Sequence, residues 1–335
     1  MVETGLSRRV IGGWRDMVAM DHSDLRANLS GRYALVTGAS SGIGAGVAAA
    51  LAANGASVWV NHPDASTADA AEAVVDGIKE TGGQATAIQA DVSSEAEVAS
   101  MFAAVAADGL DILCNNAGIA HASPVEEMAV FDFDRLMAVH VRGTFLCTRA
   151  ALKLMYPRNR GRIINTASQL AYIGAPGFSH YTAAKGAILS FTRSLALEIG
   201  DRGITANCVA PGATMTPILA DVPEEMLEGI RLNIPAGRIA EVDDIVGAYL
   251  FLASDAAGHF RGQCLSPNGG DAQKRYVRTH LHAEPVEVQT KSYLCGGRSR
   301  GRPGPKRFRS LHKVRHRGDE NSRNDWRQIH LFGSG

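Results

Sequence analysis

Tyr181 and Lys185 stand four positions apart, and Ser168 precedes Tyr181 by thirteen positions. Side chains four apart share one face of a helix, so a phenol and an ammonium group would lie side by side. Of the seven tyrosines in the chain, only Tyr181 has a lysine at this spacing. A hydroxyl, a phenol and a cation together could hold a carbonyl or alcohol oxygen and transfer a proton to or from it. These three residues are therefore a candidate acid/base set for hydride transfer to or from a carbonyl.

A glycine-rich run near the start of the chain is a candidate nucleotide site. Gly38, Gly42 and Gly44 follow Val36-Thr37 and precede an apolar stretch. In such a loop, backbone N–H groups at a helix N-terminus can approach a pyrophosphate. The spacing is Gly-x3-Gly-x-Gly rather than Gly-x-Gly-x-x-Gly, and glycine loops without a ligand are common. The prediction of nucleotide binding therefore depends on the strand before the loop and the helix after it.

Short β-rich segments alternate with longer helical segments from residue 31 onward. We expect strands at 32–37, 57–60, 85–90, 110–115, 162–167, 204–209 and 263–266. We expect helices at 43–53, 66–80, 95–106, 128–155, 180–199 and 242–252. This alternation predicts an α/β fold with one doubly wound, Rossmann-like parallel sheet. Ser168 would then follow a strand at its carboxyl end, which is the edge where open α/β sheets bind ligands.

Composition indicates a globular protein in a reducing compartment. The 335 residues are 45% hydrophobic and 20% charged, which is enough apolar material for a single large core. The five cysteines are scattered, without the spacing of metal ligands, so we expect no disulfide framework and no metal. No signal-like or membrane-spanning apolar run is found, and we expect a cytoplasmic protein without a membrane partner.

Charge and apolar content distinguish a basic C-terminal segment from the rest of the chain. Residues 273–335 hold 15 Lys and Arg against 5 Asp and Glu, a net charge of +10, so residues 1–272 carry −10. Only 11 of these 63 residues are Leu, Ile, Val or Phe, too few for a core, and we expect a disordered basic tail. The tail lacks regularly interleaved aromatic residues, so nucleic acid is not an expected partner. Residues 1–30 are expected to be a flexible extension and 31–272 the catalytic domain.

Further motifs occur in a fixed order along residues 31–272. They are the glycine loop Thr37–Gly44, Asp91-Val92, Asn115-Asn116-Ala117-Gly118, the Ser168, Tyr181 and Lys185 set, Pro211-Gly212 and Asn268-Gly269-Gly270. Their order and spacing resemble those of the classical short-chain dehydrogenases/reductases, with similarity to 3-oxoacyl-(acyl carrier protein) reductases and glucose 1-dehydrogenases. The resemblance implies a Rossmann-like domain, an NAD or NADP cofactor, and interconversion of a secondary alcohol and a ketone.

The resemblance also implies which positions contact the cofactor. Those implied for the pyrophosphate and ribose are Gly38, Ser40, Ser41, Ile43 and Gly44. Those implied for the adenine and its ribose are Asp91, Val92 and Asn116. Those implied for the nicotinamide end are Tyr181, Lys185, Pro211, Gly212, Thr214 and Thr216.

For catalysis, the resemblance implies that Tyr181 takes the alcohol proton in oxidation and returns it in reduction. The Ser168 hydroxyl would hydrogen-bond the reacting oxygen. A free phenol has a pKa of about 10, and lowering it by two units needs about 2.7 kcal/mol. Lys185 and an oxidised nicotinamide are cations that could stabilise the phenolate, and Lys185 would also bind the nicotinamide ribose.

His140 departs from the family pattern. The family usually has an asparagine here, which holds a water that links the lysine to solvent. Histidine can also hydrogen-bond water and relay protons, so we expect an altered relay, whereas a histidine that only fills a helix bend is the structural alternative. A nucleotide-binding regulatory protein with little turnover is the corresponding alternative function.

The residue near the end of the second strand bears on the choice of cofactor. A carboxylate there accepts hydrogen bonds from the ribose 2′-OH of NAD and repels the 2′-phosphate of NADP. His62 occupies this position, and the first acid is Asp64, so the sequence favours NADP(H) while NAD(H) stays open. The basic residue that many NADP-using members place in the glycine loop is replaced by Ser41. A solvent-facing loop residue is the alternative interpretation of His62.

Two apolar features concern the substrate and the assembly. Residues 215–230 are apolar on one side and acidic on the other, as in a lid over an apolar or mixed carbonyl or alcohol substrate, or in a helix packed permanently on the domain. The predicted helix from Tyr181 to Glu198 has only three charged residues, and such a helix needs cover on more than one side. The resemblance implies a homodimer or homotetramer built on this helix and the preceding long one.

Overall fold

The computed structural model describes residues 26–220, 222–272, 289–290 and 312–313. The chain divides into two units, residues 1–275 and 276–335. In the second unit, β8 (Gln289–Thr290) pairs with β9 (His312–Lys313) in antiparallel fashion. Residues 1–25 of the predicted extension and most of the predicted basic tail lie outside the described residues.

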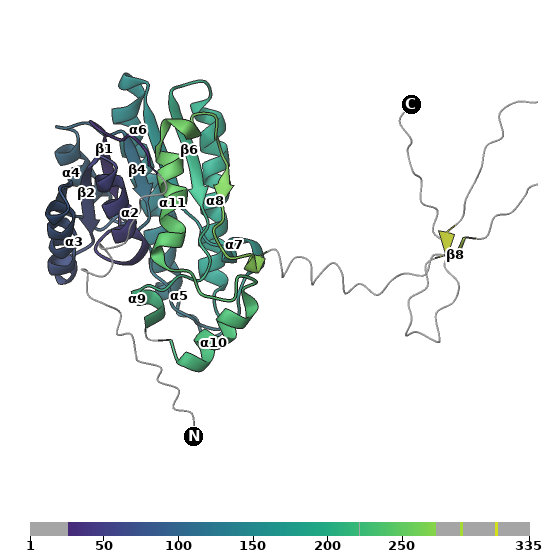
Figure 1. Cartoon of the computed structure of the whole chain (residues 1–335). Helices are drawn as coiled ribbons and strands as arrows, with labels where there is room; N and C mark the ends of the chain where they lie inside the picture. Colours follow the sequence, from purple (N-terminus) through teal and green to yellow (C-terminus); the bar gives the residue numbers. More distant parts are fainter. Residues whose placement is uncertain (1–25, 221, 273–288, 291–311, 314–335) are drawn as a thin grey trace, which may run out of the picture. The chain divides into compact units, whose positions relative to one another are not determined.

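The first unit contains a seven-stranded parallel sheet with the order β3-β2-β1-β4-β5-β6-β7 (Figure 1). Its strands are β1 (Tyr33–Val36), β2 (Ser57–His62), β3 (Gln84–Gln89), β4 (Ile112–Asn115), β5 (Gly161–Thr166), β6 (Ile204–Val209) and β7 (Cys264–Leu265). The chain builds outward from β1 to β3, then returns to β4 on the other side of β1. The strand order therefore reverses between β1 and β4, where doubly wound sheets bind ligands.

Helices cover both faces of this sheet. Their bounds are α2 (Gly42–Ala53), α3 (Ala68–Glu80), α4 (Glu95–Val105), α5 (Val130–Met137), α6 (Gly143–Arg158), α7 (Leu170–Ile173), α8 (Ser179–Ile199), α9 (Pro217–Ala220), α10 (Glu224–Asn233) and α11 (Val242–Ala253). Shorter helical turns are η1 (Ala65–Thr67), η2 (Ala138–Arg142) and η3 (Asp255–Ala257). Within the described part of the chain, none of the helices combines the length and apolar character needed to cross a bilayer. The predicted doubly wound fold is confirmed.

The core has two layers, one on each face of the sheet. Val36, Ile112 and Ile164 pack with α2, α3 and α11, whereas the adjacent strand residues Leu35 and Leu113 pack with α4, α6 and α8. Successive strand side chains point to opposite faces, so a strand buried on both faces must be apolar throughout. This requirement explains the continuous apolar runs in the sequence.

Two boundaries differ from the sequence predictions. The single helix expected at 128–155 is divided into α5 and α6 by η2, a π-helical turn. At the other end, Leu29 is fully buried and the Ala27 N–H donates to Asn54 Oδ1, at 2.8 Å. The packed part of the chain therefore begins before residue 31.

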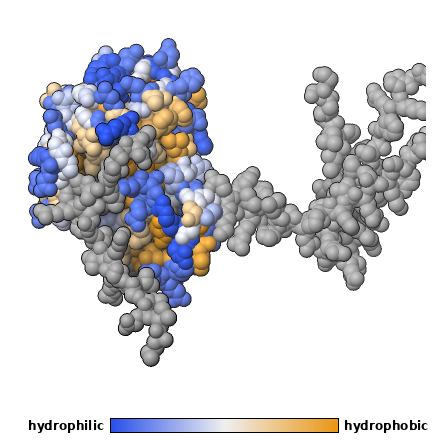
Figure 2. All heavy atoms as spheres, viewed as in Figure 1, coloured by the Kyte–Doolittle hydropathy of each residue, from blue (hydrophilic) through white to orange (hydrophobic). Residues whose placement is uncertain are grey.

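The segment predicted as a lid forms α9 and α10, which lie beyond the ends of the strands (Figure 1). Neither helix has a buried residue, and Ile218, Met226 and Leu232 are 60, 61 and 64% exposed. Figure 2 shows apolar surface in this lower region of the unit. Leu219, Leu227 and Ile230 are half-buried, so the segment rests on the domain with one side while its other apolar side chains stay exposed.

Candidate active site

A cavity of about 410 Å³ opens at the carboxyl ends of the central strands. The predicted site residues that line it are Gly38, Ser40, Ser41, Ile43, Gly44, Asp91, Val92, Asn116, His140, Tyr181, Lys185 and Thr216. The predicted site residues outside this lining are His62, Ser168, Pro211, Gly212 and Thr214. Segments as far apart in the sequence as Gly38 and Ile218 thus meet at one edge of the sheet.

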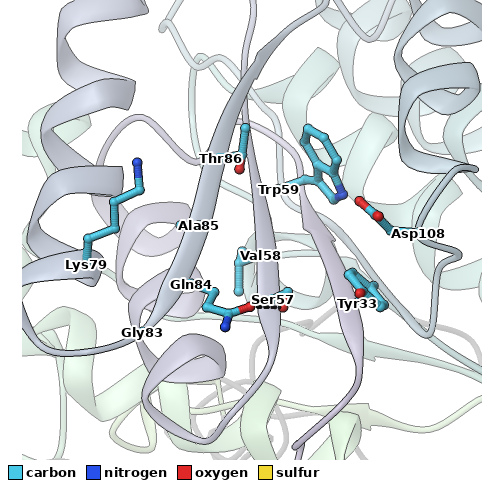
Figure 3. Close-up of a pocket in the computed structure, with 10 residues that line it drawn as sticks. All are labelled: Tyr33, Ser57, Val58, Trp59, Lys79, Gly83, Gln84, Ala85, Thr86 and Asp108. Carbon is cyan, nitrogen blue, oxygen red and sulfur yellow. Dashed lines mark hydrogen bonds between the residues drawn. The ribbon is translucent and has the colours of Figure 1, made fainter.

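A second groove, of about 370 Å³, lies at the opposite edge, where β1, β2 and β3 begin (Figure 3). Tyr33, Trp59 and Asp108 line one side of it, and Lys79 lies on the other side. None of the predicted site residues belongs to its lining. The two cavities are similar in size, so the side chains, rather than the volume, identify the candidate active site.

The glycine loop forms a cradle that only glycine fits. Gly38 has a φ of +61°, and a Cβ atom there would lie 2.7 Å from the Cα atom of Ala117. A Cβ atom on Gly44 would collide with the Gly38 carbonyl oxygen and the Asn116 amide. The loop then leads into α2, with Ser41 as its N-cap and no acidic residue in the first turn. Exposed N–H groups and the positive end of the helix dipole make this a suitable anion site.

Two asparagines hold the glycine loop in place. Asn116 Nδ2 donates to the carbonyl oxygens of Thr37 and Gly38, at 3.0 and 3.1 Å. On the other side, Asn61 Oδ1 accepts the Gly38 N–H at 3.2 Å, while Asn61 Nδ2 donates to Ala90 O at 3.0 Å. Asn61 was not predicted as a site residue, although an amide inside an otherwise apolar strand is a signal that could have identified it.

A carboxylate and an arginine lie at the end of the cavity implied for the adenine. Arg135 Nη1 lies 3.0 Å from Asp91 Oδ2 and 2.7 Å from Ser93 Oγ. Burial raises the pKa of Asp91, but hydrogen bonds from Ser93 and the charge of Arg135 outweigh this effect and keep the pKa below its ordinary value. Arg135 also lines the cavity and was missed in the sequence, because a single arginine on a predicted helix carries no distinguishing pattern.

His62 is a buried strand residue, which rules out the alternative of a solvent-facing loop residue. It is 5% exposed, and its Nδ1 atom lies 3.0 Å from Asp64 O and 3.3 Å from Thr67 Oγ1. Asp64 and Thr67, rather than His62, line the cavity. Asp64 Oδ1 accepts hydrogen bonds from the N–H and the hydroxyl of Ser66, and these bonds lower the pKa of Asp64.

Ser168 and Tyr181 interact next to the cavity. Ser168 lies two residues after the end of β5, is 7% exposed, and accepts the Leu170 N–H at 3.2 Å. Tyr181 lies in the first turn of α8 with its ring beside those of His140 and Phe178. Burial raises the pKa of the Tyr181 phenol above its ordinary value, and the interaction with Ser168 acts in the opposite direction. The phenol is therefore protonated at neutral pH in this structure.

Lys185 lies one turn further along α8 and faces the same side as Tyr181. Its Nζ atom is 5.5 Å from the centroid of the Tyr181 ring and donates to Thr166 O at 2.7 Å. The residue is 3% exposed, and burial lowers the pKa of Lys185 to about 7. Near neutral pH this amine can both hold and release a proton.

His140 lies within the π-helical turn η2 and is 1% exposed. Its Nε2 atom lies 3.1 Å from Ile119 N and 2.7 Å from Ile119 O, so it anchors the loop that follows β4. Its Nδ1 atom is buried and has no hydrogen-bond partner. Burial and the nearby Lys185 lower the pKa of His140 to about 3. The imidazole is therefore neutral at neutral pH, and any relay through it uses hydrogen bonds rather than a charged histidine.

The loop after β6 closes the remaining side of the site. Thr216 packs against the position of Gly42 and lines the cavity. Thr214 is buried and donates to Gly212 O at 3.0 Å, and Pro211 O accepts the N–H of Gln169. Pro211, Gly212 and Thr214 thus shape the loop beside Ser168 without lining the cavity.

A ladder of buried polar side chains stabilises strands β4 and β5 beside the site. Asn115 Nδ2 donates to Asn165 Oδ1 at 2.8 Å, and Asn165 Nδ2 donates to Thr192 Oγ1 at 2.8 Å. The ladder joins β4 and β5 to α8, the helix that carries Tyr181 and Lys185. Its members are spread over 78 positions, so no local sequence pattern could reveal it.

The residues present fit a dinucleotide. The glycine cradle suits a pyrophosphate, the buried His140 Nδ1 has no hydrogen-bond partner, and Tyr181 and Lys185 line the same cavity as the cradle. A Rossmann-like sheet with this cradle at its switch point, together with a buried serine, tyrosine and lysine, defines a dinucleotide-dependent oxidoreductase.

Comparisons with known proteins agree with this class. The family model described as enoyl-(acyl carrier protein) reductase matches residues 38–271, and the chain belongs to this family, within the classical short-chain dehydrogenases/reductases. The chain is 40% identical to a 3-oxoacyl-(acyl carrier protein) reductase of Synechocystis sp. over 246 residues, which are 72% of this chain and 97% of that protein.

Two further relatives are named for other substrates. A gluconate 5-dehydrogenase of Gluconobacter oxydans is 39% identical over 257 residues, covering 75% of this chain and 98% of that protein. The crystal structure of the angucycline C-6 ketoreductase LanV with bound NADP superposes with a TM-score of 0.69 at 33% identity, covering 74% of this chain and 98% of LanV. The relatives thus share a reaction class while their named substrates differ.

Proposed function

We propose that this chain interconverts a secondary alcohol and a ketone by hydride transfer, with Tyr181 as the acid/base. The observation that carries the proposal is the position of Tyr181 and Lys185 on one face of α8, in the same cavity as the glycine cradle. The two relatives named as reductases and the one named as a dehydrogenase support the reaction class. The alternative of a regulatory protein without turnover has no support in the comparisons.

In this proposal the protein's own groups hold the reacting oxygen and supply its proton. Ser168 hydrogen-bonds the carbonyl oxygen, and Tyr181 donates its phenolic proton as the alkoxide forms. Lys185 then returns a proton to the phenolate, which its pKa of about 7 permits near neutrality. When bound, the nicotinamide supplies or accepts the hydride. His140 keeps the loop around Ile119 in place on the other side of Tyr181.

The cofactor is proposed to be NADP(H) or NAD(H), with NADP(H) favoured. The end of β2 offers His62, which has turned toward Asp64 and Thr67, in place of a free carboxylate. One carboxylate oxygen of Asp64 is engaged by Ser66, and Arg135, which pairs with Asp91, lines the same cavity. Parallel titrations of NADPH and NADH by fluorescence should show tighter binding of NADPH. Tighter binding of NADH would contradict this preference without affecting the reaction class.

The substrate is proposed to be a small carbonyl or alcohol compound with an apolar part, such as a 3-oxoacyl thioester, with a sugar derivative as the alternative. Ile218 and Pro217 of α9 line the cavity and give it an apolar wall. We further propose that the enzyme is a cytoplasmic homodimer or homotetramer. Exposed apolar residues on α6 and α8, described below, support the assembly.

Replacement of Tyr181 tests the function directly. Tyr181→Phe removes the proton donor while keeping the ring, and kcat should fall about 10²- to 10⁴-fold. Binding of NADPH should change far less than kcat, because the glycine cradle is untouched. Turnover would be measured with a panel of ketones, and Tyr172→Phe, in a half-exposed tyrosine away from the cavity, serves as the control. Full activity of Tyr181→Phe would contradict the assigned mechanism.

A further inference from the structure

Two cysteines face each other on neighbouring strands at the edge of the sheet. Cys208 of β6 and Cys264 of β7 are register partners in the parallel ladder. Parallel strands lie about 4.8 Å apart, and disulfides join residues whose Cα atoms are about 4.4–6.8 Å apart. Both side chains contact the same apolar cluster beneath α8, which also contains Ile188 and Leu189. The two thiols are therefore on the same face, within the range that a disulfide spans.

The surroundings make the two thiols unequal. Cys208 is 1% exposed, and its Sγ atom lies 3.1 Å from Thr192 Oγ1. Cys264 is partly exposed on the short edge strand β7 and interacts with Cys208 and Tyr172. The interaction with Cys208 lowers the pKa of Cys264 to about 7, with Tyr172 and the positive charge of Arg193 acting in the same direction. The same interaction raises the pKa of Cys208. The thiol of the partly exposed residue is thus the more acidic one, as in reactive thiols.

We propose that Cys264 and Cys208 form a reversible oxidation site for hydroperoxides, with Cys264 as the attacking thiol and Cys208 as the resolving thiol. The Cys264 thiolate attacks the terminal oxygen of the hydroperoxide. An S–O bond forms, the O–O bond breaks, and the released alkoxide or hydroxide takes a proton. The sulfur of Cys208 then attacks the sulfenic sulfur, an S–S bond forms, and the S–O bond breaks. The hydroxide leaves as water with the proton of the Cys208 thiol, so two thiols are oxidised while the hydroperoxide is reduced to an alcohol or water.

The other described cysteines provide internal controls. Cys114 and Cys147 are fully buried in the two main core layers, and burial raises the pKa of each thiol to about 12. They lack both access and a thiolate, so hydroperoxide should leave them unchanged. Cys295 lies outside the described residues, and a Cys295→Ser background removes it from the experiment.

The test is intact mass and peptide mapping of the Cys295→Ser protein after treatment with hydrogen peroxide. The expected product has lost two hydrogens, contains one disulfide between Cys208 and Cys264, and returns to the starting mass with dithiothreitol. Adding Cys208→Ser should stop the reaction at a sulfenic acid on Cys264 that dimedone traps. Adding Cys264→Ser should abolish both products.

The mass and peptide map of the Cys295→Ser protein alone test the proposal, even if the additional variants fold poorly. Three results would overturn it: no loss of hydrogens, conversion of Cys264 to a sulfinic acid while Cys208 stays reduced, or a disulfide that involves Cys114 or Cys147.

Discussion

Burial determines how the polar side chains around Tyr181 carry charge. Lys185 and His140 are 3 and 1% exposed, and their pKa values fall to about 7 and about 3. Both shifts have burial as their largest cause, because a low-dielectric environment disfavours the protonated form of a base. The consequence is an active site whose two basic residues are largely uncharged at slightly alkaline pH, and only Lys185 can gain or lose a proton near neutrality.

The pKa of His140 predicts a pH-dependent stability. The folded-state pKa of about 3 lies below the ordinary value of 6.5, so the unfolded chain binds the extra proton first. The free energy of unfolding should therefore fall as pH drops from 6.5 toward 3, by up to about 1.4 kcal/mol per pH unit from this residue. His140→Asn should remove this part of the slope. Urea unfolding between pH 7 and pH 4.5 measures it.

An exposed histidine provides the control for this prediction. His259→Asn is the matched substitution, because this histidine is exposed whereas His140 is buried. Parallel stability curves for His140→Asn and the parent protein would contradict the role assigned to the burial of His140.

The strands and helices show how much the sequence could predict. The central strands and the helices α2, α3, α4, α8 and α11 were predicted within a few residues, because β-rich and helical segments alternate clearly along the chain. The π-helical turn at His140 was not predicted, since the sequence of residues 128–155 indicates one continuous helix. Its cause is non-local: the turn places His140 against Ile119, 21 positions away, and such insertions are frequent at functional sites. The same limit applies to Arg135, whose partners Asp91 and Ser93 are distant in sequence.

The glycine cradle yields a prediction for the loop between β1 and α2. Gly44→Ala should weaken NADPH binding by at least about 100-fold, since the added methyl group collides with Gly38 O and the Asn116 amide that hold the loop. Gly229→Ala is the matched control, because Gly229 lies in α10 with open space around its Cα atom. Fluorescence titration measures both. Equal affinity of the two variants would argue against the cradle as the pyrophosphate site.

For the whole molecule, exposed apolar side chains on two adjacent helices support self-association. Leu197 on α8 is 84% exposed, and Phe145 on α6 is 44% exposed. Exposed leucine and phenylalanine on long helices are typical of surfaces that a partner covers. Leu197→Glu should lower the molar mass in solution, measured by light scattering, because a carboxylate at the centre of an apolar contact is costly to bury. Met226→Glu on the exposed α10 should leave the mass of the assembly unchanged, and a Leu197→Glu protein of unchanged mass would contradict this surface assignment.

Two C-terminal deletions, of residues 273–335 and of residues 271–335, test the role of the basic tail. Deletion of residues 273–335 should leave kcat and KM within about twofold, because the residues that hold the site end at Asp271. Asp271 Oδ2 accepts a hydrogen bond from Gln169 Nε2 at 2.9 Å, directly beside Ser168. Deletion of residues 271–335 should therefore lower turnover, while the shorter deletion does not. Salt-sensitive RNA or DNA binding that is lost with residues 273–335 would show that the tail has a nucleic-acid partner.

The ladder of Asn115, Asn165 and Thr192 also limits the register in which β4 can pair with β5. Neighbouring apolar strands can align in more than one way, because isoleucine and valine pack almost equally well after a shift of two residues. With β4 and β5 displaced, the amides of Asn115 and Asn165 would be buried without each other, at a cost of about 1–3 kcal/mol for each unpaired group. The ladder therefore makes a misaligned pairing of β4 and β5 unfavourable, at the centre of the sheet.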